Sequence, residues 1–334
     1  MSLYDIYGIG AALVDTEIEV TDDDLENLAI EKGLMTLVDE NRQKELMDYL
    51  SDHLVASKQA SGGSGANSII AANYFGCKNF YSCKVSEDDN GNFYLKDMLA
   101  AGVTCNKNDQ RHKGVTGKCL ILITPDAERT MLTHLGISET LSVEELDLEA
   151  ARQSRFVYLE GYLVTSPTGR EAAIRLRETA RQHGVKTALS LSDPGMVEFF
   201  GDGLKEMIGE GVDLLFCNEH EATGFTQTGS LSDAAEALKK YSKSFAITRG
   251  SEGALVFDGS KLHNIAPHKV KAIDTNGAGD MFAGAFMHAL IKGFDHADAG
   301  RLASRASAEV VSGYGPRLAP EKHREILEQV FGSK

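Results

Sequence analysis

The sequence predicts an α/β protein with three layers, in which a mostly parallel β-sheet is flanked by helices and carries a small β-sheet lid. Three observations support this prediction. Apolar strands and amphipathic helices alternate in regular order from residue 156 onwards, and strands separated by helices imply a mostly parallel sheet covered on both faces. Segment 103–135 breaks this alternation with hairpin-like strands that lack intervening helices. A glycine-rich turn at 274–280 joins an expected strand to an expected helix.

The individual elements follow from the spacing of the apolar residues, which is about two in a half-buried strand and about 3.6 in a helix. Strands are expected at 4–9, 14–20, 79–85, 119–123, 129–133, 156–159, 187–191, 213–217, 244–248 and 269–273. Helices are expected at 41–54, 90–101, 169–183, 196–208 and 232–243, between Asn67 and Gly76, and from Asp280 to Lys292. Several of these helices are followed by glycine, a usual C-terminal stop.

The chain of 334 residues exceeds an average domain but fits one large α/β unit with an appendage. We expect the large unit to comprise residues 1–14, 39–102 and 136–334. Residues 15–38 and 103–135 form the expected lid, a small sheet of the kind that closes over a substrate.

Composition and charge narrow the functional class. Hydrophobic residues make up 42% and charged residues 25% of the chain, which is ordinary for a globular protein. The formal charge of −15 argues against nucleic acid as a partner, because phosphate backbones are bound by clustered Lys and Arg. No signal peptide or stretch of membrane-spanning length is apparent, so we expect a cytoplasmic protein without a membrane partner. The five cysteines lack C-x-x-C spacing and are expected to be reduced: Cys77, Cys83, Cys105, Cys119 and Cys217.

The turn at 274–280 predicts a phosphate-binding site. The first N–H groups of a helix have no internal partner and carry partial positive charge, and small residues allow an anion to approach them. Gly277, Ala278, Gly279 and Asp280 would supply this anion hole, and Asp280 could accept the proton of a hydroxyl that attacks the phosphate. Taken alone, the motif equally fits a tight turn with a capping aspartate.

A second glycine-rich loop precedes the helix that starts near Asn67. Gly62 and Gly63 lack side chains that would keep a ligand from the backbone, and Asn67 offers both a donor and an acceptor. We favour a binding site over a flexible linker, because the loop leads directly into an amphipathic helix. For Asp15, where the first strands leave the core, a ligand role and a surface role both remain open.

A third candidate site follows the buried strand at 213–217. Asn218 and Glu221 are three positions apart, so they can share a helix face and organise the water shell of Mg²⁺. A plain helix start with acidic first-turn residues is the alternative. The pattern Thr248-x-Gly250-x-x-Gly253 offers another loop with close backbone approach.

Together these four motifs resemble the ribokinase (PfkB) family of carbohydrate and nucleoside kinases, in the order and spacing of that family. Within the family, residues 15–39 resemble the adenosine-kinase-like branch most, although Gly10-Ala11 stands where those members often have Gly-Asn. The resemblance implies the ribokinase-like fold with ATP and Mg²⁺ as cofactors, and it leaves K⁺ open as an activator near the strand that ends at Asp274.

The resemblance also implies a role for each candidate residue. Asp280 would be the catalytic base, and the amides of 277–280 the anion hole. Asn218 would contact ATP and, with Glu221, hold Mg²⁺ through water. The residues implied for substrate binding are Asp15, Gly62, Gly63, Asn67 and Glu160, and those implied for ATP binding include Thr248, Gly250 and Gly253.

We therefore expect an ATP-dependent kinase that transfers the γ-phosphate to a primary hydroxyl of a ribose-like sugar or nucleoside. Arg129, in the expected lid, is a candidate phosphate contact. The alternative is a non-catalytic sugar- or nucleoside-binding regulatory protein on the same fold. The expected partner is a small molecule, and the protein is expected to be a monomer or a homodimer paired through its lids.

Overall fold

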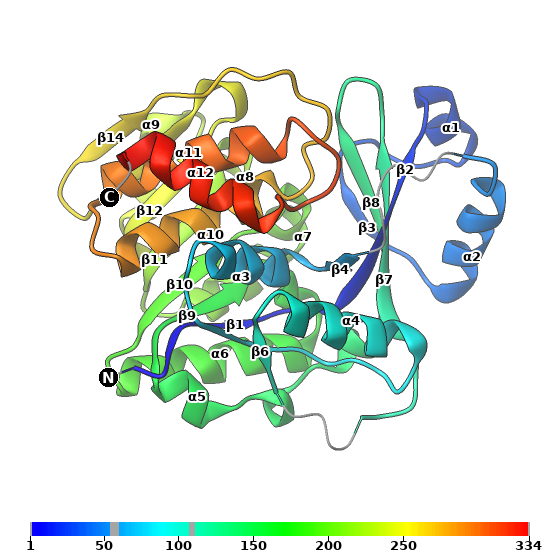
Figure 1. The fold of residues 1–334 in the computed structure, drawn as a ribbon, viewed down its shortest axis with the longest axis horizontal. Helices are drawn as coiled ribbons and strands as arrows, with labels where there is room; N and C mark the ends of the chain where they lie inside the picture. The colour runs from blue at the N-terminus through cyan, green and yellow to red at the C-terminus, as the bar shows by residue number, and fades with distance from the viewer. Residues whose placement is uncertain (1, 54–59, 107–110, 333–334) are drawn as a thin grey trace.

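A computed structural model describes residues 2–53, 60–106 and 111–332 of the chain. In this described part, the chain forms a nine-stranded sheet and a five-stranded sheet. Figure 1 shows the smaller sheet standing across one end of the larger one. The expected units also include residues 1, 54–59, 107–110 and 333–334, and the helix expected at 41–54 includes Leu54; these lie outside the described residues.

The larger sheet is parallel from its centre to one edge and ends in an antiparallel hairpin at the other edge. Its strand order is β14-β13-β12-β11-β10-β9-β1-β5-β6, and only the pairs β12–β13 and β13–β14 are antiparallel. The strands are β1 (Tyr4–Ile9), β5 (Asn79–Ser82), β6 (Thr104–Cys105), β9 (Ser154–Glu160), β10 (Lys186–Ser190), β11 (Val212–Asn218), β12 (Ser242–Thr248), β13 (Ala254–Phe257) and β14 (Leu262–Ile265).

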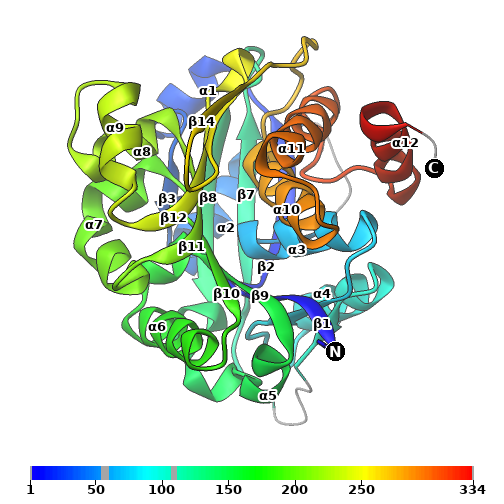
Figure 2. The ribbon, with the colours of Figure 1, turned by 90° about the vertical axis from the view of Figure 1, so that its left-hand side faces the viewer.

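Helices cover both faces of this sheet, as Figure 2 shows. One face packs against α3 (Ser64–Tyr74), α4 (Asp89–Ala100), α10 (Ala278–Ile291) and α11 (His296–Val310), and α12 (Pro320–Phe331) packs outside α11 and the end of α3. The other face packs against α5 (Leu148–Arg152), α6 (Pro167–Gln182), α7 (Pro194–Ile208), α8 (Glu219–Thr226) and α9 (Leu231–Leu238). Neighbouring residues of one strand, such as Val157 and Tyr158, belong to opposite cores. This alternation follows from the two-residue period of a strand.

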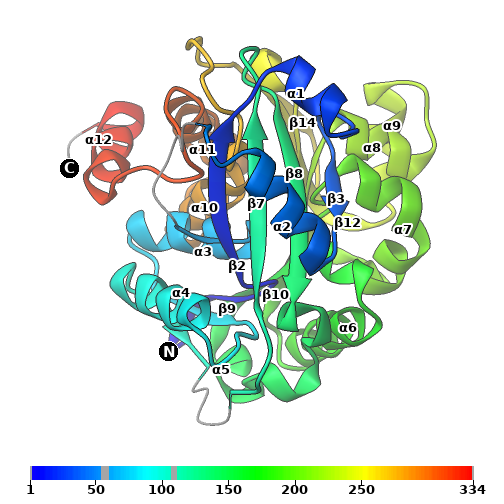
Figure 3. The same cartoon turned by 90° about the vertical axis from the view of Figure 1, so that its right-hand side faces the viewer.

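The smaller sheet has the order β3-β8-β7-β2-β4. Its strands are β2 (Leu13–Glu19), β3 (Met35–Leu37), β4 (Ala60–Gly62), β7 (Thr116–Ile123) and β8 (Arg129–Gly136). The helices α1 (Asp22–Asn27) and α2 (Glu40–Tyr49) lie over its outer face (Figure 3). Short 3₁₀ helices complete the fold: η1 (Ile137–Thr140), η2 (Val143–Glu145), η3 (Gly161–Thr165) and η4 (Gly250–Glu252).

The smaller sheet extends beyond the residues expected for the lid. Residues 39–102 are expected in the large unit, whereas α2 and β4 belong to the layer of the smaller sheet. The apolar face of α2 explains the difference, because Leu46 packs with Ile18 and Leu120 of that sheet. Amphipathic spacing shows that a helix face is buried, but it does not show which sheet buries it.

Several expected elements differ from the structure in extent, and one did not form: the helix expected at 41–54 ends at Tyr49, and the strand expected at 79–85 ends at Ser82. Residues 269–273 form no strand within the described chain; 269–272 are exposed, and the N–H of Ile273 donates to the carbonyl of Val311. Alternating residues cannot form a strand without a partner strand, and β14 already ends the sheet at that edge. The helix expected at 232–243 ends at Leu238, and β12 starts at Ser242.

No helix in the described part of the chain is long and apolar enough to cross a membrane.

Candidate active site

A cavity of about 390 Å³ lies between the smaller sheet and the larger one. The parallel strands β9, β10, β11 and β12 end toward it, which is where ligands bind in open α/β sheets. It collects most of the predicted site residues, namely Asp15, Gly63, Asn67, Arg129, Glu160, Asn218, Glu221, Thr248, Gly277, Ala278, Gly279 and Asp280. Of the other predicted residues, Gly62, Gly250 and Gly253 do not line this cavity.

Asp280 lies where the N-terminal ends of α10 and α3 meet. Its Oδ1 accepts a hydrogen bond from the hydroxyl of Ser64 at 2.6 Å, and its Oδ2 accepts one from Nδ2 of Asn67 at 3.2 Å. Burial raises the pKa of Asp280, while these two bonds and the guanidinium groups of Arg129 and Arg317 oppose that rise. The carboxylate is thus held in place at the wall of the cavity.

The N-terminus of α10 fits an anion. Gly277 is its N-cap residue and provides no side chain to satisfy the first N–H groups of the helix. A Cβ on Gly277 would lie 2.5 Å from Pro316, and its φ of +74° favours glycine. A Cβ on Gly279 would meet no atom within 4 Å, so the first turn faces open space. The first N–H groups of α10 are therefore accessible to a ligand, and the phosphate site at this helix start remains a prediction.

Asp15, on β2, lines the cavity beside the two glycines that precede α3. A Cβ on Gly62 would lie 2.0 Å from the carboxyl group of Asp15, so only glycine fits beside this side chain. Gly63 has a φ of +91°, and a Cβ there would lie 2.4 Å from the carbonyl oxygen of Ala11. Burial raises the pKa of Asp15 well above its ordinary value. Gly62 therefore does not line the cavity itself, but its missing side chain leaves room for the Asp15 side chain that does.

Glu160 connects two chain segments that border the cavity. Its carboxylate accepts hydrogen bonds from the N–H of Ala11 at 3.2 Å and the N–H of Gly65 at 2.6 Å. The side chain is 1% exposed, and burial raises its pKa to about 7. Glu160 thus fixes the position of the loop before α3 relative to the end of β1.

Asn218 and Glu221 form a reciprocal capping box at the start of α8. Nδ2 of Asn218 donates to Glu221 at 2.6 Å, and the N–H of Glu221 donates to Oδ1 of Asn218 at 2.8 Å. Burial raises the pKa of Glu221 to about 7. Among the described residues, no three His, Cys, Asp or Glu side chains are grouped to hold a metal ion. Asn218 and Glu221 both line the cavity, and an amide oxygen beside a carboxylate is a donor set that suits Mg²⁺ with most of its waters kept.

The end of β12 contributes Thr248 to the cavity wall. Gly250 and Gly253 lie in the following turn with φ of +52° and +88°. A Cβ on Gly253 would lie 2.1 Å from the carbonyl oxygen of Ile265. The two glycines therefore shape the turn beside the cavity.

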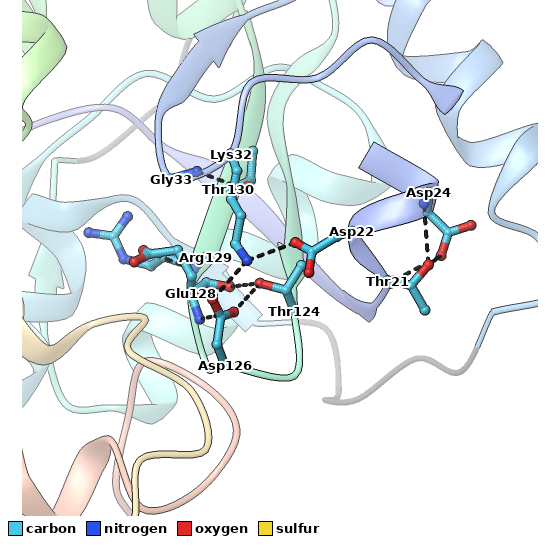
Figure 4. A network of polar contacts seen from close by, with 10 residues as sticks. All are labelled: Thr21, Asp22, Asp24, Lys32, Gly33, Thr124, Asp126, Glu128, Arg129 and Thr130. Carbon is cyan, nitrogen blue, oxygen red and sulfur yellow. Dashed lines mark hydrogen bonds and ion pairs between the residues drawn. The ribbon is translucent and has the colours of Figure 1, made fainter. Parts of the chain in front are cut away.

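Arg129 starts the lid strand β8 and lines the cavity. Figure 4 shows its side chain extending away from the ion pairs of the lid tip. There Lys32 contacts both Asp22 and Asp126 at 2.8 Å, which connects the loop before β3 to the turn between β7 and β8. This network holds the turn from which Arg129 projects.

Sequence reasoning missed several residues of the site. Ser64 was part of the recognised loop, and its hydroxyl could have been identified as a partner for a carboxylate. Tyr162 and Asp193 line the cavity beyond β9 and β10 without any local motif. Arg317 contacts Asn67 from a loop near the C-terminus, 250 positions away. No local signal in the sequence indicates that contact.

Comparison with known proteins agrees with this architecture. Residues 35–323 match the description pfkB family carbohydrate kinase. Adenosine kinase 2 of Arabidopsis thaliana is 27% identical over 313 residues, covering 86% of this chain and 88% of that protein.

Two solved structures cover nearly the whole chain. A probable sugar kinase protein from Rhizobium etli CFN 42 has a TM-score of 0.93 at 29% identity and covers 98% of this chain and 99% of its own. Adenosine kinase from Sinorhizobium meliloti has a TM-score of 0.91 at 30% identity, with coverages of 96% and 99%. The predicted ribokinase-like fold is confirmed.

The fold, the site and these similarities define a phosphotransferase that acts on a hydroxyl group. The chain belongs to the pfkB family of carbohydrate kinases, since the family match covers most of its length. The family implies ATP as the phosphoryl donor and a small sugar or nucleoside as the acceptor. The predicted adenosine-kinase-like branch is supported by the same relatives.

Proposed function

We propose that this protein transfers the γ-phosphate of ATP to the primary hydroxyl of a nucleoside or ribose-like sugar, with Asp280 as the general base. The observation that carries the proposal is the position of Asp280. Its carboxylate is held by Ser64 and Asn67 at the wall of the cavity, directly in the first turn of α10. A base and an anion-binding helix terminus therefore face the same space.

In the proposed reaction, a carboxylate oxygen of Asp280 accepts the proton of the acceptor hydroxyl, and the hydroxyl oxygen of the acceptor attacks the γ-phosphorus. The bond from the γ-phosphorus to the bridging oxygen of ADP breaks as the new bond forms. The amides of Gly277, Ala278 and Gly279 would stabilise the charge on the transferred group. Arg129 would add a positive charge from the lid, where it lines the cavity.

The remaining predicted residues divide between the two substrates. Asp15, Gly63 and Asn67 would bind or align the acceptor, and Thr248 and Asn218 would bind the ATP side. With Glu221, Asn218 would hold the water shell of Mg²⁺, which neutralises phosphate charge when bound. Glu160 supports the acceptor loop through backbone N–H groups rather than through a free carboxylate. Dependence on K⁺ remains a prediction from the family resemblance.

The lid favours a nucleoside over a free sugar. The cavity wall on that side includes a continuous set of apolar side chains beside the polar Asp15, Glu128, Arg129 and Thr133; the apolar ones are Leu13, Met35, Leu37, Ile121, Met131 and Leu135. A free sugar has hydroxyl groups on all sides, and burying them against such a wall leaves them without partners. A nucleobase instead presents flat apolar faces that fit it, and several curated relatives are named adenosine kinases.

The test is an assay of ADP release over a panel of nucleosides and sugars. We expect turnover with at least one nucleoside, and none with the matching 5′-deoxynucleoside, which lacks the accepting hydroxyl. ADP release with sugars alone would contradict the assignment of a nucleoside acceptor. Tight acceptor binding without ADP release from any compound would favour a non-catalytic ligand sensor.

A further inference from the structure

Arg317 lies in the loop between α11 and α12, outside the four motifs, and its guanidinium group donates hydrogen bonds to three side chains. Nε donates to Oδ1 of Asn67 at 3.1 Å, Nη1 donates to Asp97 at 2.9 Å, and Nη2 donates to the hydroxyl of Ser61 at 3.0 Å. Its side chain is 15% exposed and does not line the cavity. Arg317 therefore makes no direct contact with the cavity; its hydrogen bonds reach the site through Asn67, and its positive charge also acts on Asp280.

The contact between Arg317 and Asn67 fixes the orientation of the side-chain amide of Asn67. A carboxamide has an acceptor end and a donor end, whereas a guanidinium can only donate. Because Nε of Arg317 requires an acceptor, Oδ1 of Asn67 faces Arg317, and Nδ2 faces the carboxylate of Asp280. In the flipped amide, two donors would face each other on one side and two acceptors on the other. Arg317 thereby keeps a donor directed at Asp280.

The orientation of Arg317 is itself determined by its other two partners. Asp97 on α4 and Ser61 on β4 also hydrogen bond to each other, so they form one acceptor surface for the guanidinium. A planar guanidinium can meet three acceptors in fixed directions, but an ammonium group on a flexible chain cannot reproduce that geometry. The network thus extends from α4 through Arg317 and Asn67 to Asp280.

We infer that Arg317 is a positioning residue for phosphoryl transfer, which acts by orienting the Asn67 amide that holds Asp280. The inference rests on the proposed function, because it assumes that Asp280 is the general base. A misplaced catalytic group costs rate even where binding is unaffected, since the reacting atoms must be aligned in the transition state.

The test compares Arg317→Met with Arg305→Met. Arg305 is a matched control because its side chain is 19% exposed and contacts Glu309 at 2.7 Å and Gln329 at 3.1 Å, away from the cavity. We expect Arg317→Met to lower kcat by about tenfold or more while KM for the acceptor changes by less than about threefold. Arg305→Met should keep the wild-type kcat. Thermal unfolding of both variants ensures that rates are measured on folded protein.

Two further variants separate positioning from simple charge. If Arg317 acts through Asn67, its removal in an Asn67→Ala background should change kcat by less than about twofold, because the residue it orients is gone. Arg317→Lys keeps the positive charge but not the planar guanidinium group, so we expect its kcat to be nearly as low as that of Arg317→Met. Full recovery of kcat in Arg317→Lys, or additive losses in the double variant, would overturn the inference.

The pH dependence of kcat provides a further readout. The charged and titratable groups that face Asp280 are Arg129 of the lid, Arg317, Asp15 of β2, Glu160 of β9, Tyr158 and Tyr162. Arg317→Met removes both the orientation of the Asn67 donor and the positive charge that opposes the rise in the pKa of Asp280, so the acidic limb of its kcat profile should move to higher pH. Arg317→Lys keeps the charge, so a shift of its limb reports the lost orientation alone. An unmoved limb in Arg317→Lys would contradict the inference. If Asp280→Asn retains full turnover, the proposed function fails instead. An inactive Asp280→Asn beside a fully active Arg317→Met overturns this inference alone.

Discussion

The hydroxyl of Ser64 donates to Oδ1 of Asp280 at 2.6 Å, across 216 positions of the chain. This contact joins the first residue of α3 to the first turn of α10. The glycine loops before both helices therefore meet at one carboxylate. A hydroxyl donor stabilises the ionised form of a carboxyl group, which is the form that a general base requires.

Replacing Ser64 with alanine should make Asp280 a weaker catalyst near neutral pH. Burial raises the pKa of Asp280, and the bond from Ser64 is the largest of the contacts that oppose this rise. Without it, a larger fraction of Asp280 is protonated, so the acidic limb of the kcat profile should move to higher pH. Ser68→Ala is the matched control, because Ser68 lies one turn later on α3 and contacts Tyr158 instead. Equal profiles for Ser64→Ala and wild type would contradict this prediction.

Replacing Asp280 with asparagine should remove nearly all turnover. General-base catalysis contributes typically about 10²–10⁴ in rate, and asparagine keeps the shape of the side chain without its basicity. ATP binding, measured by calorimetry, should persist because the amides at the start of α10 remain. ADP release at the wild-type rate would show that Asp280 is not the base.

Replacing Gly62 with alanine should impair acceptor binding, because Gly62 packs against Asp15 behind the cavity wall. The new Cβ would lie 2.0 Å from the carboxyl group of Asp15, so that side chain or β4 must move. We expect a rise in the acceptor KM of about tenfold or more, with a loss of about 1–3 kcal/mol in the free energy of unfolding. Gly201→Ala is the control, since a Cβ there meets no atom within 4 Å and should leave KM unchanged. An unchanged KM in Gly62→Ala would argue against a role of Asp15 in acceptor binding.

Replacing Glu160 with glutamine should change the pH dependence of stability. Burial raises the pKa of Glu160 to about 7, compared with about 4.3 for an unperturbed glutamate. Because the pKa is higher in the folded state, Glu160 contributes stability that is complete below about pH 4.3 and is lost as the pH rises through about 7. Glutamine does not titrate, so only wild type loses this stability. The free energy of unfolding of Glu160→Gln minus that of wild type should therefore rise by about 1–3 kcal/mol from about pH 5 to about pH 8.

Denaturant titrations of both proteins at the two pH values check this prediction. The exposed Glu171 on α6 provides a Glu→Gln control for the effect of the substitution away from the cavity. A difference between Glu160→Gln and wild type that stays constant with pH would show that Glu160 does not titrate in this range.

The sequence identified most of the site because its motifs are local. Glycines at 62, 63, 277 and 279 mark turns before helices, and such turns can be recognised from a few consecutive residues. Most strands and helices of the larger sheet followed from the spacing of apolar residues for the same reason. The strand expected at 269–273 was wrong because pairing depends on a neighbour that local spacing does not reveal.

By itself, the sequence determined the alternating strands and helices from residue 156 to 248, the glycine turns and the aspartate in the first turn of α10, since each depends on residues close in the chain. The tertiary structure decided which of these surfaces meet. It placed α2 on the smaller sheet, and it brought Arg317 to Asn67 across 250 positions. Such contacts depend on how distant layers pack together. No local sequence pattern indicates which residue a guanidinium group in a C-terminal loop will contact.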